Sequence, residues 1–370
     1  MAVRTAVVGG GTISRVHLRG ARENPQTELV GICDLDESVA RERAREFGTM
    51  AFTDFSELLA AGIDCLHICT PVQSHFEIAS QAIEAGVGVI IEKPATVTVE
   101  EIEKLEELSE EYDVPATVIH NHLFYPVVRQ ACEMIESGEL GKLQSVDVIY
   151  TGLTPPDQVN RGSWVFDLPG GEFEEGIPHP IYTVLGVGGF PESIDGISAQ
   201  TALLEEYEDG FSYDQAQVNY VSESGVLCSV KMLSGGQPQR MHVINGSEKS
   251  LILDEINQSL YTVDEDYTNS AVSRTKKAVD VSMAQLSSTA QNVKLVASNR
   301  FDDSWENEAE SNSHFAIFDE FVECLEGHGD VPASLEQSKW TIRTMEAIRA
   351  AAEPSTEKSQ PAEETVSITQ

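Results

Sequence analysis

Residues 5–14 read TAVVGGGTIS, a short apolar run that ends in three glycines and leads into an amphipathic stretch from Ser14. Gly9 permits a tight turn at this junction, and Gly11 lets a ligand approach the backbone. A helix that begins at Ser14 directs its free N–H groups toward an anion such as a pyrophosphate. The stretch therefore predicts a strand–loop–helix unit that binds a dinucleotide. The expected phosphate contacts are Gly9, Gly11, Thr12 and Ile13.

The same alternation continues through the first 120 residues. The apolar runs ELVGICD, IDCLHICT and GVIIEK are each followed by an amphipathic stretch, and PATVIHN supplies one more strand. Strands that alternate with helices predict βαβ units and a parallel sheet. We expect residues 1–121 to form a doubly wound Rossmann domain. The expected helices after the first are Glu37–Phe47, Ser74–Ala85 and Val99–Tyr112.

The acidic residue at the end of the second strand favours one cofactor. Asp34 lies 20 residues after Ser14, where a carboxylate accepts hydrogen bonds from the adenine-ribose hydroxyls. It would also repel the 2′-phosphate of NADP. We therefore expect NAD, and the simpler alternative is a surface aspartate that follows a strand.

Polar groups also follow the third and fourth strands, in CTPVQSH (residues 69–75) and VIIEKPATV (residues 89–97). Ligands of open α/β sheets bind at the carboxyl ends of the strands, which places Lys93 near the nicotinamide. In that position we expect Lys93 either to have a lowered pKa or to donate a hydrogen bond to the substrate oxygen. His75 is better explained as a packed or helix-capping residue than as an acid or base. The expected cofactor contacts are Thr70, Pro71, His75, Glu92 and Lys93.

After residue 121 strands follow one another without intervening helices, which predicts an antiparallel sheet in an α+β domain over residues 122–353. Residues 268–300 are expected to be helical, with Arg274, Lys276 and Lys277 as a lid, an anion contact, a partner surface or a solvated face. The tail 354–370 lacks a hydrophobic face and is expected to be disordered.

The second domain contains the segment LPGGEFEEGIPHPIY, in which Glu175 precedes His179 by four residues. On one helical turn the two side chains share a face, and a carboxylate beside a histidine fixes its tautomer for proton removal from an alcohol. Pro178 and Pro180 limit how regular this helix can be. A zinc site would need a third ligand that the segment does not supply, so we expect no metal. Candidate substrate contacts are Asn121, Asn160, Arg161, Trp164 and Tyr182, with a packed core Trp164 as the alternative.

Charge excludes several classes of partner. The chain has 24 Lys and Arg against 61 Asp and Glu, a formal net charge of −37, which disfavours nucleic acid and anionic membranes. No run reaches the ~18 apolar residues of a membrane helix, and no signal peptide is recognisable, so we expect a cytoplasmic protein. Of six cysteines only Cys65 and Cys69 lie close in sequence, which is too few for a metal site.

The acidic composition is typical of a protein kept soluble in a salt-loving cytoplasm, where counterions screen its self-repulsion. Dilution from molar salt is therefore expected to unfold the protein, because repulsion among the surplus carboxylates grows as screening falls. Circular dichroism during dialysis checks this. Unchanged stability in dilute buffer would indicate an ordinary acidic protein.

In this order, VVGGGTISRVH, CDLDE, CTPVQSH, VIIEKP and GGEFEEGIPH resemble the glucose-fructose oxidoreductase, inositol dehydrogenase and rhizopine catabolism (Gfo/Idh/MocA) family. The resemblance implies a Rossmann domain and then a large, open-faced, mostly antiparallel sheet used to form a homodimer or homotetramer. It also implies that Lys93 orients substrate and His179 is the catalytic histidine. The family commonly has Asp where this chain has Glu175 and Tyr182.

The motifs and the resemblance together predict hydride transfer between NAD and a hydroxyl or carbonyl carbon of a sugar, polyol or sugar derivative. His179 would take the hydroxyl proton, Lys93 would hold that oxygen, and Glu175 would orient His179. Two other classes remain open: a lyase or glycosidase that regenerates bound NAD in each cycle, and a non-catalytic NAD-dependent sensor.

Overall fold

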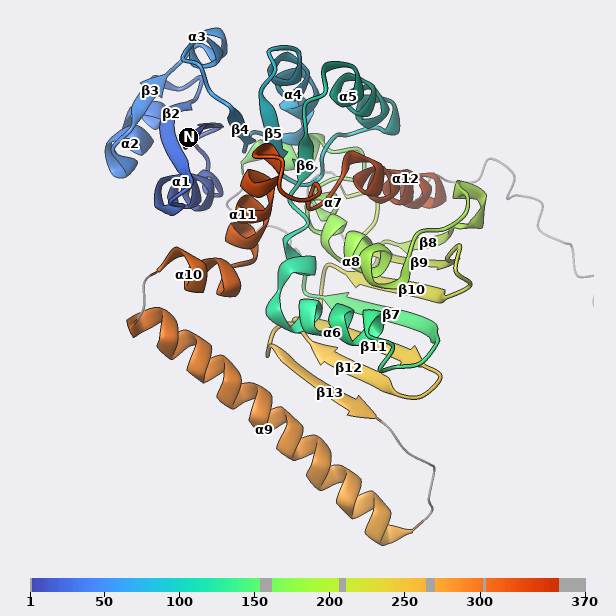
Figure 1. The fold of residues 1–370 in the computed structure, drawn as a ribbon. Helices are drawn as coiled ribbons and strands as arrows, with labels where there is room; N and C mark the ends of the chain where they lie inside the picture. The colour runs from blue at the N-terminus through green and yellow to red at the C-terminus, as the bar shows by residue number, and fades with distance from the viewer. Residues whose placement is uncertain (1, 154–161, 206–210, 264–269, 302–303, 353–370) are drawn as a thin grey trace, which may run out of the picture.

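A computed structural model of the chain describes residues 2–153, 162–205, 211–263, 270–301 and 304–352 (Figure 1). The expected tail at 354–370 lies outside these residues, as do Asn160 and Arg161. Two sheets dominate the described chain, one of six strands and one of seven. No described helix is long and apolar enough to span a membrane.

The first sheet is parallel throughout, in the order β3-β2-β1-β4-β5-β6. Strands β4 and β5 are buried along their whole length, as expected for a sheet covered on both faces. Its strands are β1 Val3–Val8, β2 Thr27–Cys33, β3 Met50–Phe52, β4 Cys65–Ile68, β5 Gly88–Ile91 and β6 Ala116–Val118. Its helices are α1 Ser14–Glu23, α2 Glu37–Phe47, α3 Phe55–Ala60, α4 His75–Glu84 and α5 Val99–Tyr112. The order reverses beside β1, so the loops after β1 and β4 diverge at the carboxyl ends where ligands of such sheets bind.

Local signals explain where these helices begin. The Asp36 carboxylate accepts the N–H groups of Ser38 and Val39 and so caps α2. Thr98 and Glu101 form a reciprocal capping box at the start of α5. The sequence prediction is confirmed for both helices. Among the described elements of this half it missed β3, α3 and the 3₁₀ turn Val72–Ser74.

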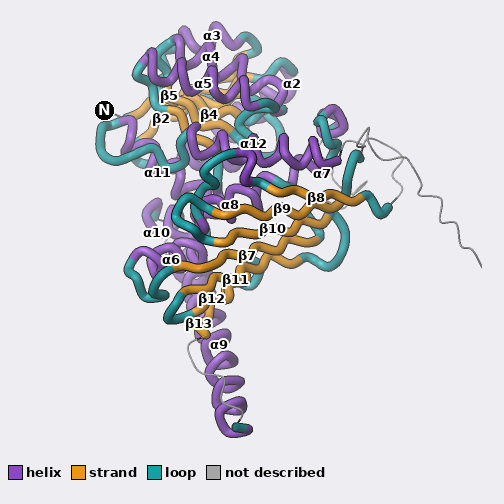
Figure 2. Tube along the Cα trace, turned by 90° about the vertical axis from the view of Figure 1, so that its right-hand side faces the viewer, coloured by secondary structure: helices purple, strands orange, loops and turns teal. Residues whose placement is uncertain are grey.

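The second sheet has the order β13-β12-β11-β7-β10-β9-β8 and is antiparallel except for the β7–β10 pair (Figure 2). Along β7 the buried Val146, Val148 and Tyr150 alternate with partly exposed residues, so helices cover one face only. Its strands are β7 Leu143–Thr151, β8 Ser198–Ala202, β9 Gln215–Val221, β10 Leu227–Leu233, β11 Gln239–Gly246, β12 Ser250–Asp254 and β13 Ser259–Val263. Helices α6 Pro126–Glu136, α7 Phe173–Gly176 and α8 Pro178–Gly188 belong to this half. The expected α/β fold class and mostly antiparallel second sheet are confirmed.

The end of the chain returns to the first sheet. Helices α10 Trp305–Ser311 and α11 Ser313–Leu325 follow the long helix α9 Ala271–Phe301, which extends away from the body of the protein (Figure 1). Phe315 and Phe318 of α11 share a buried cluster with Cys65 and Ile90 of the first sheet. The sequence prediction assigned this segment to the second domain, whereas its side chains complete the core beneath the first.

The last helix, α12 Leu335–Ala352, joins the two halves through a buried ion pair. Arg349 Nε and Nη2 each lie 2.8–2.9 Å from an oxygen of Glu174, whose side chain has no exposed area. Arg349 Nη1 also donates to the carbonyl of Val97 at 2.9 Å. One guanidinium therefore links α12 to α7 of the second half and to the loop before α5 of the first.

Replacing Arg349 by methionine is expected to lower the free energy of unfolding by about 3 kcal/mol, because the buried Glu174 carboxylate loses its cation. Urea unfolding at fixed salt measures the change. The matched control is Arg343→Met on the same helix, whose pair with Glu103 is 29% and 45% exposed and is worth less than about 1 kcal/mol. Equal losses in the two variants would contradict the assignment.

Candidate active site

The loop between β1 and α1 has the geometry expected from its glycines. Gly9 has φ of +90°, and a Cβ there would lie 2.7 Å from the carbonyl carbon and oxygen of Cys69. At Gly11 a Cβ would meet nothing within 4 Å. The first position therefore requires glycine for its packing on the end of β4, while the backbone at Gly11 is open to a ligand. Thr12 is exposed and Ile13 half-buried just before α1 begins.

Asp34 follows β2 and faces this loop. Its carboxylate accepts the N–H of Gly10 at 2.7 Å and that of Asp36 at 2.8 Å. Arg43 donates from Nε to the Gly10 carbonyl at 3.1 Å and pairs with Glu42 and Glu46. The sequence analysis did not identify Arg43. A basic residue in the middle of an amphipathic helix is common, and the local sequence does not show that it contacts the loop after β1.

His75 connects the loops that follow β4 and β5. Its Nε2 lies 2.8 Å from the carbonyl oxygen of Thr70 and its Nδ1 lies 3.1 Å from that of Pro94. Burial lowers the pKa of His75, so the ring is neutral and donates to one carbonyl at a time. Neither His75 nor Ser74 caps α4 through its side chain, contrary to one sequence expectation; Ser74 bonds Thr70 and Pro71 instead. His75 thus fixes the two loops relative to each other.

Lys93 extends from the loop after β5 toward the second half of the chain. Its Nζ donates to Glu175 Oε1 at 2.6 Å and to the Glu175 carbonyl at 3.0 Å. Both side chains are nearly buried, at 11% and 12% exposed. The backbone N–H of Lys93 donates to Glu92 Oε2 at 3.2 Å, and the Lys93–Pro94 peptide is cis. The ammonium group is therefore held in one direction by a charged partner.

His179 lies in the first turn of α8, where Tyr182 holds it. His179 Nδ1 is 2.7 Å from Tyr182 Oη, and that hydroxyl donates to Asn121 Oδ1 at 3.1 Å and accepts the N–H of His122 at 3.2 Å. The tyrosine has one proton; when that proton goes to Asn121, His179 donates from Nδ1 and has its lone pair on Nε2. Both residues were expected as substrate contacts. In this structure the buried Tyr182 bonds His179, and the buried Asn121 bonds Tyr182.

The expected Glu175–His179 pairing differs from the arrangement observed. Helix α7 ends at Gly176 and α8 begins at Pro178, so the spacing of four residues does not fall on one continuous turn. The Glu175 carboxylate turns to Lys93, and Tyr182 takes the place at His179 Nδ1. In the described contacts Tyr182 bonds His179 and Glu175 bonds Lys93.

A buried network behind His179 was not expected from sequence. The His122 ring stacks on His179 with 4.3 Å between centroids, and its Nδ1 lies 3.0 Å from Glu255 Oε2. His242 Nε2 is 2.7 Å from the other Glu255 oxygen. Desolvation alone would raise the pKa of Glu255, but hydrogen bonds with both histidines lower it to about 2. These residues lie in separate elements, which is why no spacing in the sequence reveals them.

Trp164 lies in the 3₁₀ turn Ser163–Asp167 and is half-buried. Its carbonyl accepts the side-chain N–H of Gln73, in the loop after β4, at 3.1 Å. The structure therefore brings Trp164 to the loops that carry Thr70 and Pro71.

Sequence comparisons assign both halves of the chain. Residues 3–120 match a family described as oxidoreductases with an NAD-binding Rossmann fold, GFO_IDH_MocA, and residues 128–252 match the GFO/IDH/MocA C-terminal domain. The rhizopine catabolism protein MocA of Rhizobium meliloti is 27% identical over 176 residues, 46% of this chain and 55% of that protein. The chain thus spans about half the length of this relative. Inositol 2-dehydrogenase of Rhizobium meliloti (strain 1021) is 24% identical over 66% of this chain and 73% of its own length.

Solved structures share the fold over nearly the whole chain. UDP-N-acetylglucosamine 3-dehydrogenase from Acidithiobacillus ferrooxidans superposes with a TM-score of 0.70 at 18% identity, covering 95% of this chain and 98% of that one. The WlbA dehydrogenase from Bordetella pertussis, in complex with NADH and UDP-GlcNAcA, gives a TM-score of 0.74 at 20% identity over 95% and 97%. Two family models that together match more than half of the residues show that the chain belongs to the Gfo/Idh/MocA family of oxidoreductases.

Proposed function

We propose that the protein is an NAD-dependent dehydrogenase that oxidises a secondary alcohol or hemiacetal of a sugar, polyol or sugar derivative, or reduces the corresponding carbonyl. Residues 1–121 would bind the cofactor, and residues 122–353 would supply substrate groups and subunit contacts. The observation that carries the proposal is the convergence of Lys93 with the His179 site. Lys93 Nζ bonds both the carboxylate and the carbonyl of Glu175, four residues before His179 in the same segment.

The loops at the carboxyl ends of the first sheet fit NAD. The open backbone at Gly11 accommodates a pyrophosphate, and Asp34 has a carboxylate at the end of β2 for the ribose hydroxyls. Arg43, the basic side chain that an NADP 2′-phosphate would need, already pairs with Glu42 and Glu46. These contacts favour NAD over NADP. When bound, the nicotinamide supplies the hydride acceptor.

Lys93 and His179 have different roles at the substrate oxygen. Nε2 of His179 carries the lone pair that takes the hydroxyl proton, because Tyr182 fixes the other tautomeric position. The Lys93 ammonium donates a hydrogen bond to the same oxygen and stabilises the charge that develops as the proton leaves. Glu175 balances the Lys93 charge and keeps the ammonium in place.

NADH formation tests the proposal across inositols, aldoses, polyols and nucleotide sugars at molar salt, with NADP run alongside. The relatives named above act on inositol and on a UDP-sugar, so both classes belong in the panel. We expect NADH to accumulate with at least one member and NADP to react more slowly. A product without NADH accumulation would favour a lyase or glycosidase, and NAD binding without any turnover would favour a sensor.

The long helix α9 supports a homo-oligomer. Its exposed apolar side chains are Val272, Val279, Met283 and Leu286, between 54% and 79% exposed. At about 100° per residue they form one narrow stripe, the pattern of a helix that packs on another surface. Arg274, Lys276 and Lys277 lie on the same helix in a chain of net charge −37. We propose that this apolar stripe packs against a second copy of the chain.

Leu286→Glu is expected to weaken this association by about 100-fold in Kd, because a carboxylate enters an apolar contact. Light scattering after size-exclusion chromatography at molar salt measures the assembly mass over a dilution series. The matched control is Gln285→Glu, an exposed position on the far side of α9 from the stripe. Identical masses for the two variants and the parent would show that α9 is not a subunit contact.

A further inference from the structure

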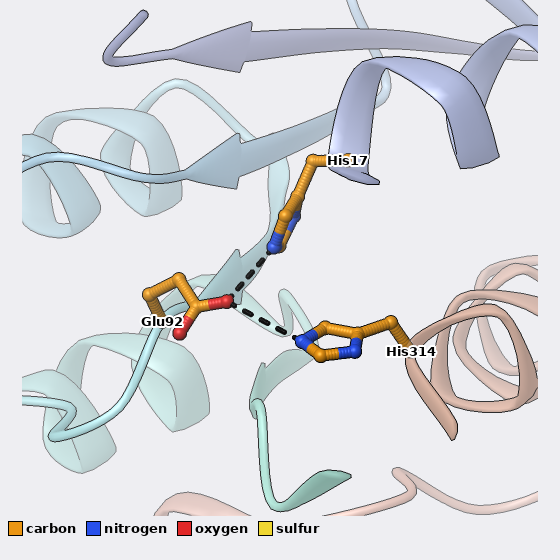
Figure 3. Close-up of side chains that lie close together, drawn as sticks. All are labelled: His17, Glu92 and His314. Carbon is orange, nitrogen blue, oxygen red and sulfur yellow. Dashed lines mark hydrogen bonds and ion pairs between the residues drawn. The ribbon is translucent and has the colours of Figure 1, made fainter. Parts of the chain in front are cut away.

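A second polar cluster lies behind the loop that carries Lys93. His17 of α1, Glu92 after β5 and His314 of α11 point toward one another from three distant parts of the chain (Figure 3). His17 Nε2 lies 2.9 Å and His314 Nε2 lies 3.9 Å from the same oxygen of Glu92. The three potential ligand atoms fall within 4.8 Å of one another. The cluster therefore gathers two imidazoles and one carboxylate around a common point.

Glu92 is buried, with 7% of its surface exposed. Its described ion-pair partners are the imidazoles of His17 and His314. Lys93, next in the chain, directs its ammonium to Glu175. A carboxylate removed from water is stabilised by a cation, and imidazole nitrogens bind the same cation.

We propose that His17, Glu92 and His314 bind a divalent transition metal ion, with Zn²⁺ as the best match. Two histidines and a carboxylate are a common protein ligand set for zinc, with water or another group in the fourth position. Ligand atoms at zinc distances of about 2.0–2.1 Å lie roughly 3.3 Å apart in a tetrahedral site. The Glu92 oxygen lies 2.9 Å and 3.9 Å from the two imidazole nitrogens, and the three atoms lie within 4.8 Å of one another. Shifts of up to about 1.5 Å would therefore reach that geometry.

The surroundings of His17 suit a metal ligand. Its Nδ1 lies 2.9 Å from Nδ1 of the buried His67. With the metal on Nε2, the Nδ1–H of His17 donates to His67, the outer hydrogen bond that metal-bound histidines usually make. The second oxygen of Glu92 accepts the backbone N–H of Lys93 at 3.2 Å. The ion would therefore fix the turn that positions Lys93 without touching the substrate.

Zinc binding by the full-length protein tests the proposal directly. Protein stripped with a chelator is dialysed against Zn²⁺, and bound metal is measured by mass spectrometry of the element. We expect one equivalent per chain and at least about a 100-fold weaker affinity in His314→Gln, which removes a direct ligand. The matched control is His328→Gln, an exposed histidine, which should bind zinc like the parent.

X-ray absorption of the zinc-loaded parent protein keeps the test independent of any variant's folding. Scattering from two imidazoles is the expected result. Three results would overturn the proposed zinc site. They are a parent protein that binds no zinc, the same zinc affinity in His314→Gln and the parent, and an X-ray absorption spectrum without imidazole ligands around the zinc. In those cases His17 donates its Nε2–H to Glu92, and the cluster is a hydrogen-bond network only.

Discussion

Lys93→Ala is expected to lower kcat by about 10² to 10⁴-fold while NAD affinity changes little. The variant removes the ammonium that would hold the substrate oxygen, whereas the Gly9–Ser14 loop and Asp34, which would hold the cofactor, are unaltered. Steady-state rates on the best substrate of the panel, together with NAD titration by fluorescence, separate the two effects.

The matched control is Lys104→Ala, which removes an exposed lysine from an ion pair with Glu100. Both lysines pair with a glutamate, but the Lys104 side chain is 52% exposed against 11% for Lys93. The control should retain full turnover. Full turnover in Lys93→Ala would refute the role given to the ammonium. A parallel loss of NAD affinity would show that the cofactor contact expected of Lys93 outweighs its contact with the substrate.

Mild acid is expected to destabilise the protein well before its carboxylates are protonated. Burial lowers the pKa of six histidines, which are His17, His67, His75, His120, His122 and His314. For His120 the folded value is about 3, against an ordinary value of 6.5. The unfolded chain therefore binds more protons than the folded chain below pH 6.5. Stability is complete above that pH and falls as the pH drops toward the folded value.

The size of the acid effect follows from linkage. Each such histidine contributes about 1.4 kcal/mol per pH unit, so several together remove much of a typical stability of 5–15 kcal/mol within about two units. Urea unfolding of metal-free protein at several pH values measures the slope. His120→Gln should reduce the slope of the unfolding free energy against pH by the contribution of one histidine. The control His328→Gln, at an exposed position, should leave that slope unchanged. A flat profile from the ordinary value of 6.5 down to about pH 5 would show that the rings are not held neutral.

Elements with strong local signals were predictable from sequence. Helices α2 and α5 have the expected bounds because an acidic or capping-box residue starts each one and a left-handed residue ends it. Strand β3 has three residues and α3 has six, too short for hydrophobic periodicity to show. Their existence depends on neighbours that the local sequence does not reveal.

The candidate site likewise has one part that the sequence predicts and another that it does not. Lys93 follows a buried strand of a parallel sheet, so topology alone predicts that it lies near a ligand. Tyr182 and Asn121 are 61 residues apart in the chain, and Tyr150 and Glu255 are 105 apart, so their contacts depend on packing between elements. Helix α7 ends before α8 begins, and the Glu175 carboxylate bonds Lys93. Pro178 and Pro180 indicated an irregular helix in this segment, but they did not predict the partner of Glu175.

The return of α10 and α11 to the first sheet affects how the chain folds during synthesis. Phe315 and Phe318 belong to the core of a sheet whose last strand ends at Val118. Domains usually fold in order as they leave the ribosome, but this one remains without part of its core until almost the whole chain has been translated. A fragment ending near residue 121 should therefore expose apolar surface and aggregate, although its motifs for cofactor binding are complete.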